Sequence, residues 1–97
     1  MRYIKIPIDQ ARCNELEKMT YNLTGYRNLL STMSEDNEIR KQYFNDYMEL
    51  VNKYEILKRH TSTEYVDPEL NENEEANWKL NFDTSTIEVA IKDKEYD

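Results

Sequence analysis

Apolar and polar side chains alternate in the first segment of the chain, YIKIPI at residues 3–8. A period of two places one set of side chains on each side of an extended chain, here Ile4, Ile6 and Ile8 against Tyr3, Lys5 and Pro7. This pattern predicts a half-buried strand over residues 3–8. Because proline lacks an N–H, we expect this strand to end there or to lie at an edge of its sheet. Asp9 follows as the expected N-cap of a helix.

The spacing of apolar residues then changes to alternating steps of three and four, which is typical of amphipathic helices. A first helix is predicted over residues 10–33, with a stripe formed by Leu16, Met19, Leu23, Tyr26, Leu30 and Met33. A second helix is predicted over residues 35–60, capped by Ser34, with a broader stripe formed by Ile39, Tyr43, Phe44, Tyr47, Leu50, Val51, Tyr54 and Leu57. The short connection makes the helices antiparallel. Gly25 is expected where they approach closely, opposite Tyr43 and Phe44.

A polar segment and a second alternating region complete the chain. Residues 67–77 contain five acidic residues and no Lys or Arg, so a solvated acidic loop is predicted over residues 66–76. A β-hairpin is predicted over residues 77–92, with strand faces formed by Trp78, Leu80 and Phe82 and by Ile87, Val89 and Ile91. The order β-α-α-β-β predicts a two-layer α+β fold, in which a long antiparallel αα-hairpin packs on a small three-stranded sheet. With 97 residues, we expect a single domain over residues 1–97.

Composition and charge narrow the range of functions. There are 20 Asp and Glu against 13 Lys and Arg, so the formal net charge is −7, which opposes direct binding of nucleic acid. A single cysteine, Cys13, cannot form a disulfide within the chain. Neither an N-terminal apolar leader nor an apolar run long enough to cross a membrane is present, so we expect a cytoplasmic protein without membrane contact.

Conventional catalytic and metal-binding motifs are missing from the sequence. His60 is the only histidine, so a nucleophilic pair would have to join it to Cys13 across one end of the helical hairpin. The interpretation that we favour is a buried thiol and a cation near a helix C-terminus. No zinc or calcium motif occurs, and a chain with one Gly has no glycine-rich phosphate loop. We therefore expect no enzyme activity, no cofactor and no metal.

Tyrosine is unusually frequent, with eight residues in the chain. Tyr suits the wet boundary of a small core, and it is equally typical of protein interfaces. We expect a partner surface on the helix backs, the helix ends and the acidic segment. Its candidate residues are Tyr21, Tyr43, Tyr65, Glu69, Glu72, Glu74 and Glu75.

These features favour a small non-enzymatic protein-protein interaction module, such as an adaptor, accessory subunit or assembly factor, which binds a larger protein or forms a homodimer. The chain is similar in general character to small acidic proteins of bacteriophages and mobile elements, and to accessory subunits of peptide-modification clusters, although no motif names a family. An alternative is an acidic inhibitor that mimics nucleic acid and blocks a nucleic-acid-binding protein. A third hypothesis is an enzyme or small-molecule binder with a pocket between helices and sheet.

Overall fold

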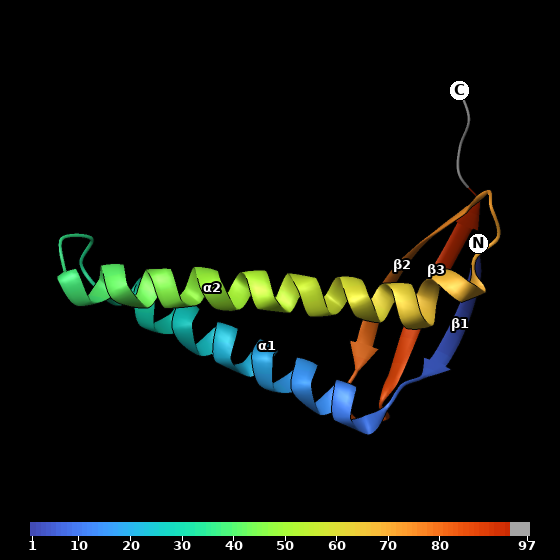
Figure 1. The fold of residues 1–97 in the computed structure, drawn as a ribbon, viewed down its shortest axis with the longest axis horizontal. Coiled ribbons are helices and arrows are strands. Elements are labelled where there is room, and N and C mark those ends of the chain that lie inside the picture. Colours follow the sequence, from blue (N-terminus) through green and yellow to red (C-terminus); the bar gives the residue numbers. More distant parts are fainter. Residues whose placement is uncertain (94–97) are drawn as a thin grey trace. The chain divides into compact units, whose positions relative to one another are not determined.

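The computed structural model describes residues 1–93, and Tyr96, the last of the tyrosines, lies outside the described residues. The elements follow one another as β1 (Arg2–Pro7), α1 (Gln10–Ser31), α2 (Glu38–Thr61), the π-helical turn η1 (Ser62–Val66), the 3₁₀ turn η2 (Asp67–Glu69), β2 (Glu74–Asn81) and β3 (Thr86–Asp93) (Figure 1). This order confirms the predicted α+β fold with a helical hairpin and a three-stranded sheet.

The sheet is antiparallel throughout and has the order β1-β3-β2. The last strand of the chain is therefore the central one, and Val89 is paired with Ile4 on one side and with Trp78 on the other. Alternation puts Ile87, Val89 and Ile91 on the same face of β3, where each is at most 2% exposed. This row supplies three of the six residues in the buried core cluster at the sheet.

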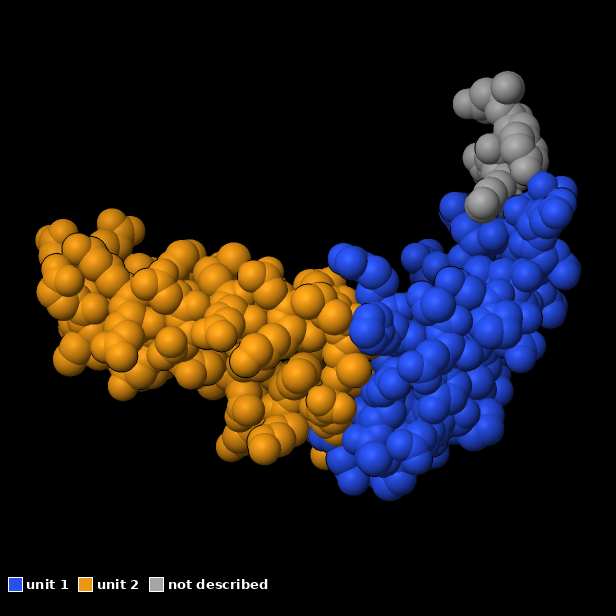
Figure 2. Space-filling model, viewed as in Figure 1, with its two compact units in different colours: residues 1–14, 59–97 blue, residues 15–58 orange. Residues whose placement is uncertain are grey.

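Residues group into two compact units, coloured separately in Figure 2. Residues 1–14 and the chain from residue 59 onward form the sheet unit, and residues 15–58 form the helical unit. The core of the sheet unit consists of Ile8, Cys13, Val66, Ile87, Val89 and Ile91. In the same unit, Arg12 donates to Thr61 Oγ1 and to the Glu64 carboxylate, both at 2.9 Å. One part of the prediction stays a prediction: the packing of the helical hairpin on the sheet as the second layer of a single domain.

The connection between the helices is longer than predicted. α1 ends at Ser31, since Thr32 N–H donates to the carbonyl of Leu29 and Met33 N–H to that of Leu30, three residues back in each case. α2 begins at Glu38, because Asn37 Oδ1 accepts a hydrogen bond of 2.8 Å from Ile39 N–H. The prediction of Ser34 as the cap was wrong.

Segment 66–76, predicted as an acidic loop, is largely ordered into short elements. Val66 ends η1 and is 1% exposed, and η2 occupies residues 67–69. β2 starts at Glu74, three residues earlier than predicted. The acidic residues can enter the strand because cations of the other two strands pair with them. Lys92 on the adjacent β3 pairs with Glu75 at 3.3 Å, and Arg2 on β1, across β3, pairs with Glu74 at 2.9 Å.

Gly25 does not mark a close approach of the helices, which corrects the sequence prediction. A Cβ at this position would meet no atom within 4 Å. The neighbouring residue, Tyr26, faces α2 instead, and its ring centroid lies 6.5 Å from that of Tyr43 and 6.4 Å from that of Tyr47. The position of Gly25 was predicted by counting residues from the turn between the helices, and that turn is longer than expected. An error of one residue rotates the predicted position by about 100° around the helix.

Candidate protein-binding surface

The helical unit buries few side chains. α1 contributes Leu16, Leu23 and Leu30, which are 2%, 3% and 8% exposed. Within residues 38–58 of α2, by contrast, no residue is fully buried. A pair of helices has only one seam, so a helix with a wide apolar stripe leaves part of it outside the seam.

The seam between the helices is built from tyrosines whose rings are half-buried. Tyr26 packs against Tyr43 and Tyr47 with tilted rings. Arg27 Nε donates a hydrogen bond of 2.9 Å to Tyr47 Oη, and this bond raises the pKa of the Arg27 guanidinium. Because the pKa is raised, the contribution of this bond to stability is fully present below the ordinary pKa of arginine. This contribution is lost as the pH rises through the raised pKa. Tyr26, Tyr43 and Tyr47 therefore lie at the wet boundary of the seam.

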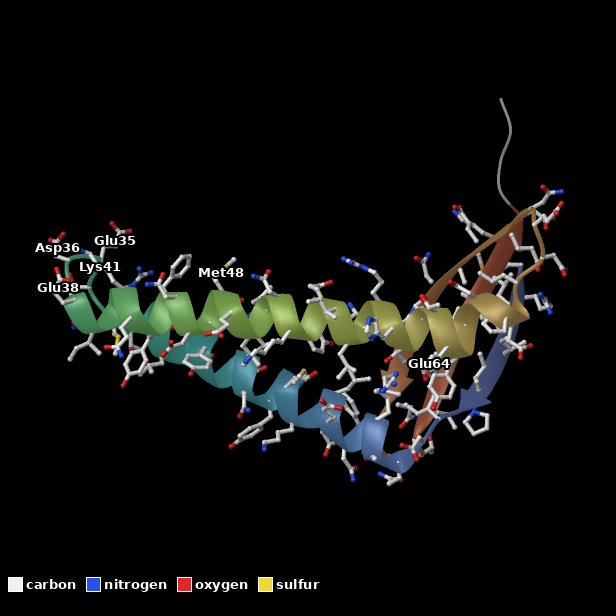
Figure 3. All side chains as sticks on the ribbon, in the orientation of Figure 1. Glu35, Asp36, Glu38, Lys41, Met48 and Glu64 are labelled. Carbon is white, nitrogen blue, oxygen red and sulfur yellow. The ribbon has the colours of Figure 1, made fainter. Side chains whose placement is uncertain are left out.

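A second row of residues on α2 lies outside this seam. Phe44 is 44% exposed, Met48 is 41% exposed, and Val51 is half-buried. Lys41 and Glu55 extend the row in the same steps of three and four, so all five residues fall within an arc of about 80° around the helix. Figure 3 shows Met48 on the side of α2 that points away from α1, with Lys41 nearer to the connection between the helices. We call Lys41, Phe44, Met48, Val51 and Glu55 the α2 stripe.

The charges at the ends of the stripe are exposed and differ in sign. Lys41 is 62% exposed at its side chain and forms an ion pair of 3.1 Å with Glu38. Glu55 is exposed and has no ion-pair partner among residues 1–93. Next to Lys41, Arg40 Nε is buried and finds no hydrogen-bond acceptor within the described part of the chain.

The tyrosines predicted as partner-binding residues have different environments. Tyr21 on α1 is 79% exposed, whereas Tyr43 is half-buried in the seam. Tyr65 belongs to the sheet unit, packs on its core and accepts a hydrogen bond of 3.3 Å from Asp9 N–H. Of the three, Tyr21 alone presents most of its ring to solvent.

The predicted acidic candidates all belong to the sheet unit but do not form one track. Glu74 pairs with Arg2 and also accepts a hydrogen bond of 3.0 Å from Asn71 N–H. Glu75 is adjacent in the strand, so its side chain points to the opposite face, where it pairs with Lys92. The other two candidates, Glu69 and Glu72, are exposed and have no cation partner within residues 1–93. Half of the acidic candidates are thus neutralised locally.

The residues considered for catalysis or metal binding do not form a site. Cys13 is 1% exposed, and its thiol is enclosed in the core of the sheet unit, whereas His60 is exposed. Across residues 1–93, no three His, Cys, Asp or Glu side chains are grouped so as to hold a metal ion. Neither helix, within the same range, has a stretch that is long and apolar enough to cross a membrane.

Two open depressions lie elsewhere on the surface. One, of about 720 Å³, lies on the sheet where the small side chain of Ala90 separates Tyr3 from Asn77, with Lys5, Lys79 and Glu88 beside it. The other, of about 650 Å³, lies along the helical pair and is lined by Tyr21, Gly25, Leu29, Asp46, Leu50 and Lys53. Both are shallow and have mixed polarity along their edges, so neither resembles the enclosed pocket that a small-molecule site needs.

Comparison with protein-family models, with curated proteins and with solved structures finds no match for this chain.

The sequence prediction missed the α2 stripe as a separate surface. Its members Phe44 and Val51 were assigned to the predicted core stripe of the second helix, and Met48 was not assigned at all. The missed signal was the width of that stripe. At 100° per residue, the predicted stripe of the second helix spans about 140°, against about 100° for the first helix. The excess width is the part that lies outside the seam.

Proposed function

We propose that this protein is a non-enzymatic protein-binding module and that the α2 stripe is its binding surface. The observation that carries the proposal is the exposure of Phe44 and Met48, at 44% and 41%, one helical turn apart on the same side of α2. Phe and Met are enriched in protein interfaces. Full burial of such a side chain from complete exposure contributes about 1.5–3 kcal/mol, so covering the 44% of Phe44 and the 41% of Met48 that are exposed contributes about 1 kcal/mol each.

The neighbours of the stripe support this assignment. Asn45 and Asn52 flank it on one side and carry no charge that would have to be desolvated with the apolar residues. Lys41 and Glu55 at its ends supply the polar rim that surrounds the apolar centre of many interfaces. The arrangement therefore has the anatomy of a small interface on a single helix.

The alternative function, mimicry of nucleic acid, receives less support. A mimic needs a row of free carboxylates on one surface, and Glu74 and Glu75 are each paired with a cation on opposite faces of the sheet. A catalytic function receives little support either, because the thiol of Cys13 is 1% exposed.

Photo-crosslinking tests the proposed function. A photoreactive phenylalanine analogue replaces Phe44 in one variant and Glu17, an exposed residue of α1, in a matched control. Each variant is irradiated as pure protein and in an extract of the native source. We expect position 44 to give defined protein adducts, either with a second copy of this chain or with another protein, and position 17 to give none.

Failure of position 44 to form adducts above the level of position 17 in both samples would contradict the proposed function. Circular dichroism of both variants establishes that the helices are intact, so that loss of crosslinking reports on contact and not on unfolding.

A further inference from the structure

We infer that the occupant of the α2 stripe is a second copy of this chain, with the two α2 helices antiparallel and a two-fold axis beside Met48. This inference rests on the proposed function and specifies its partner. It is carried by the arrangement of charge on the stripe, which is complementary to itself in only one orientation.

Met48 lies at the midpoint of the stripe. Lys41 is seven positions before it and Glu55 seven positions after it, so each charge lies about 10.5 Å from Met48 along the helix axis. A two-fold axis that reverses the helix direction at Met48 places Lys41 of one copy opposite Glu55 of the other. The symmetry generates this ion pair twice, once at each end of the interface.

The same spacing opposes a parallel dimer. In register, a parallel arrangement would place Lys41 opposite its own copy and Glu55 opposite its own copy, so that both ends of the interface would hold like charges. The apolar centre, Phe44, Met48 and Val51, favours association in either direction. The charges therefore select the antiparallel orientation.

The surroundings of the stripe are compatible with this arrangement. Under the two-fold axis, the flank with Asn45 and Asn52 meets the same flank of the second copy without a charge conflict. On the other flank, the Lys58 ammonium lies 5.5 Å from the centre of the Tyr54 ring and is attracted to it.

Self-association also compensates for the thin core of the helical unit. Two α1–α2 pairs joined through α2 form a four-helix arrangement, which is a common way for short helical hairpins to bury a second seam. In the single chain, residues 38–58 bury no side chain fully.

A charge-swap cycle tests the inference, with the dissociation constant of the dimer measured by sedimentation equilibrium. Lys41→Glu and Glu55→Lys each place two like-charged pairs in the dimer, so each should weaken dimerisation by about tenfold or more. The double variant Lys41→Glu/Glu55→Lys recreates both pairs with reversed polarity and should return the dissociation constant to within about threefold of the original chain.

Glu49→Lys and Lys53→Glu form a matched control pair. These residues form an exposed ion pair of 3.8 Å one turn apart on α2, outside the stripe, so their reversal should leave dimerisation unchanged. Circular dichroism of all variants checks that helix content is preserved.

Several results would overturn the inference. One is a chain that stays monomeric up to about 1 mM, where even weak specific dimers are populated. Another is a dimer in which the double variant is as weak as the single variants, since this would show that Lys41 and Glu55 do not pair across the interface. A third is a dimer that neither single variant weakens, since this would place the interface elsewhere. If the chain is monomeric and position 44 crosslinks to a different protein, the inference fails while the proposed function stands. If position 44 forms no adduct at all, the proposed function fails as well.

Discussion

At the scale of single residues, identical side chains have different roles according to the element that holds them. Ile87 on the central strand is 0% exposed, whereas Ile56 on α2 is 51% exposed. The hydrophobic pattern identified Ile87 as a core residue because alternation assigns a strand residue to one face without ambiguity. The same pattern could not predict the exposure of Phe44. A helix residue beside the seam is covered only if a further element or another protein packs on that side of the helix.

A pair of isoleucine substitutions tests this difference. Ile87→Ala should lower the free energy of unfolding by about 2–5 kcal/mol, since it leaves a cavity in the packed core of the sheet unit. Ile56→Ala should change it by less than about 0.5 kcal/mol, because the side chain is half exposed. Urea denaturation measures both values. A large loss for Ile56→Ala would show that this side of α2 is packed in the native protein.

Gly25 gives a second prediction at this scale. A Cβ at Gly25 would meet no atom within 4 Å, and Gly25 itself does not have a positive φ. Alanine therefore fits the native conformation. Gly25→Ala should therefore raise the free energy of unfolding by about 0.5–1 kcal/mol through the higher helix propensity of alanine. Thermal unfolding followed by circular dichroism measures the change. A destabilised variant would restore the sequence-based view that the helices need a glycine here.

At the scale of elements, the sequence predicted the type and order of every long element, and the errors lie at the ends. Alternation located β1 to within one residue at each end, and the steps of three and four located both helices. The N-cap of α2 was misplaced because Ser34 and Asn37 are both good capping residues, and only the backbone path of the connection decides between them. The start of β2 was missed because its first two residues, Glu74 and Glu75, become suitable for a strand only when Arg2 on β1 and Lys92 on β3 pair with them.

The two capping candidates can be compared directly. Asn37→Ala removes the acceptor of the hydrogen bond from Ile39 N–H and should destabilise the helical unit by about 1 kcal/mol. Ser34→Ala is the matched control, because Ser34 Oγ accepts only a long hydrogen bond of 3.4 Å from Asp36 N–H before the helix begins. The melting temperature from circular dichroism ranks the two variants. An equal or larger effect of Ser34→Ala would contradict the assigned helix start.

At the scale of the whole molecule, two of the four acidic candidates, Glu74 and Glu75, are neutralised by cations on opposite faces of the sheet and do not contribute to one acidic surface. The candidate site was therefore only partly predictable from sequence. Tyr21 was predicted to be available to a partner, and it is exposed. The predicted Tyr43 and Tyr65 are half-buried by neighbours in two different units, and sequence spacing does not reveal such neighbours.

A neutralised variant tests the role of the acidic segment. Replacing Glu69, Glu72, Glu74 and Glu75 by Gln removes the negative charge that a nucleic-acid mimic would need, and leaves the α2 stripe intact. We expect crosslinking from position 44 to be unchanged, with at most about 1 kcal/mol of stability lost per broken surface ion pair. Loss of binding by this variant, with its fold preserved, would favour the acidic inhibitor instead.

Whether a protein covers the α2 stripe can be measured at Met48 itself. With ¹³C-labelled methionine methyl groups and a soluble paramagnetic agent, the solvent exposure of Met48 can be compared with that of Met1, which is 78% exposed and serves as an internal reference. We expect Met48 to lose most of its paramagnetic broadening as the concentration of the pure protein is raised, while Met1 keeps its own. If Met48 stays as accessible as in the dilute chain at every concentration, and also after an extract of the native source is added, the α2 stripe is not a protein-binding surface.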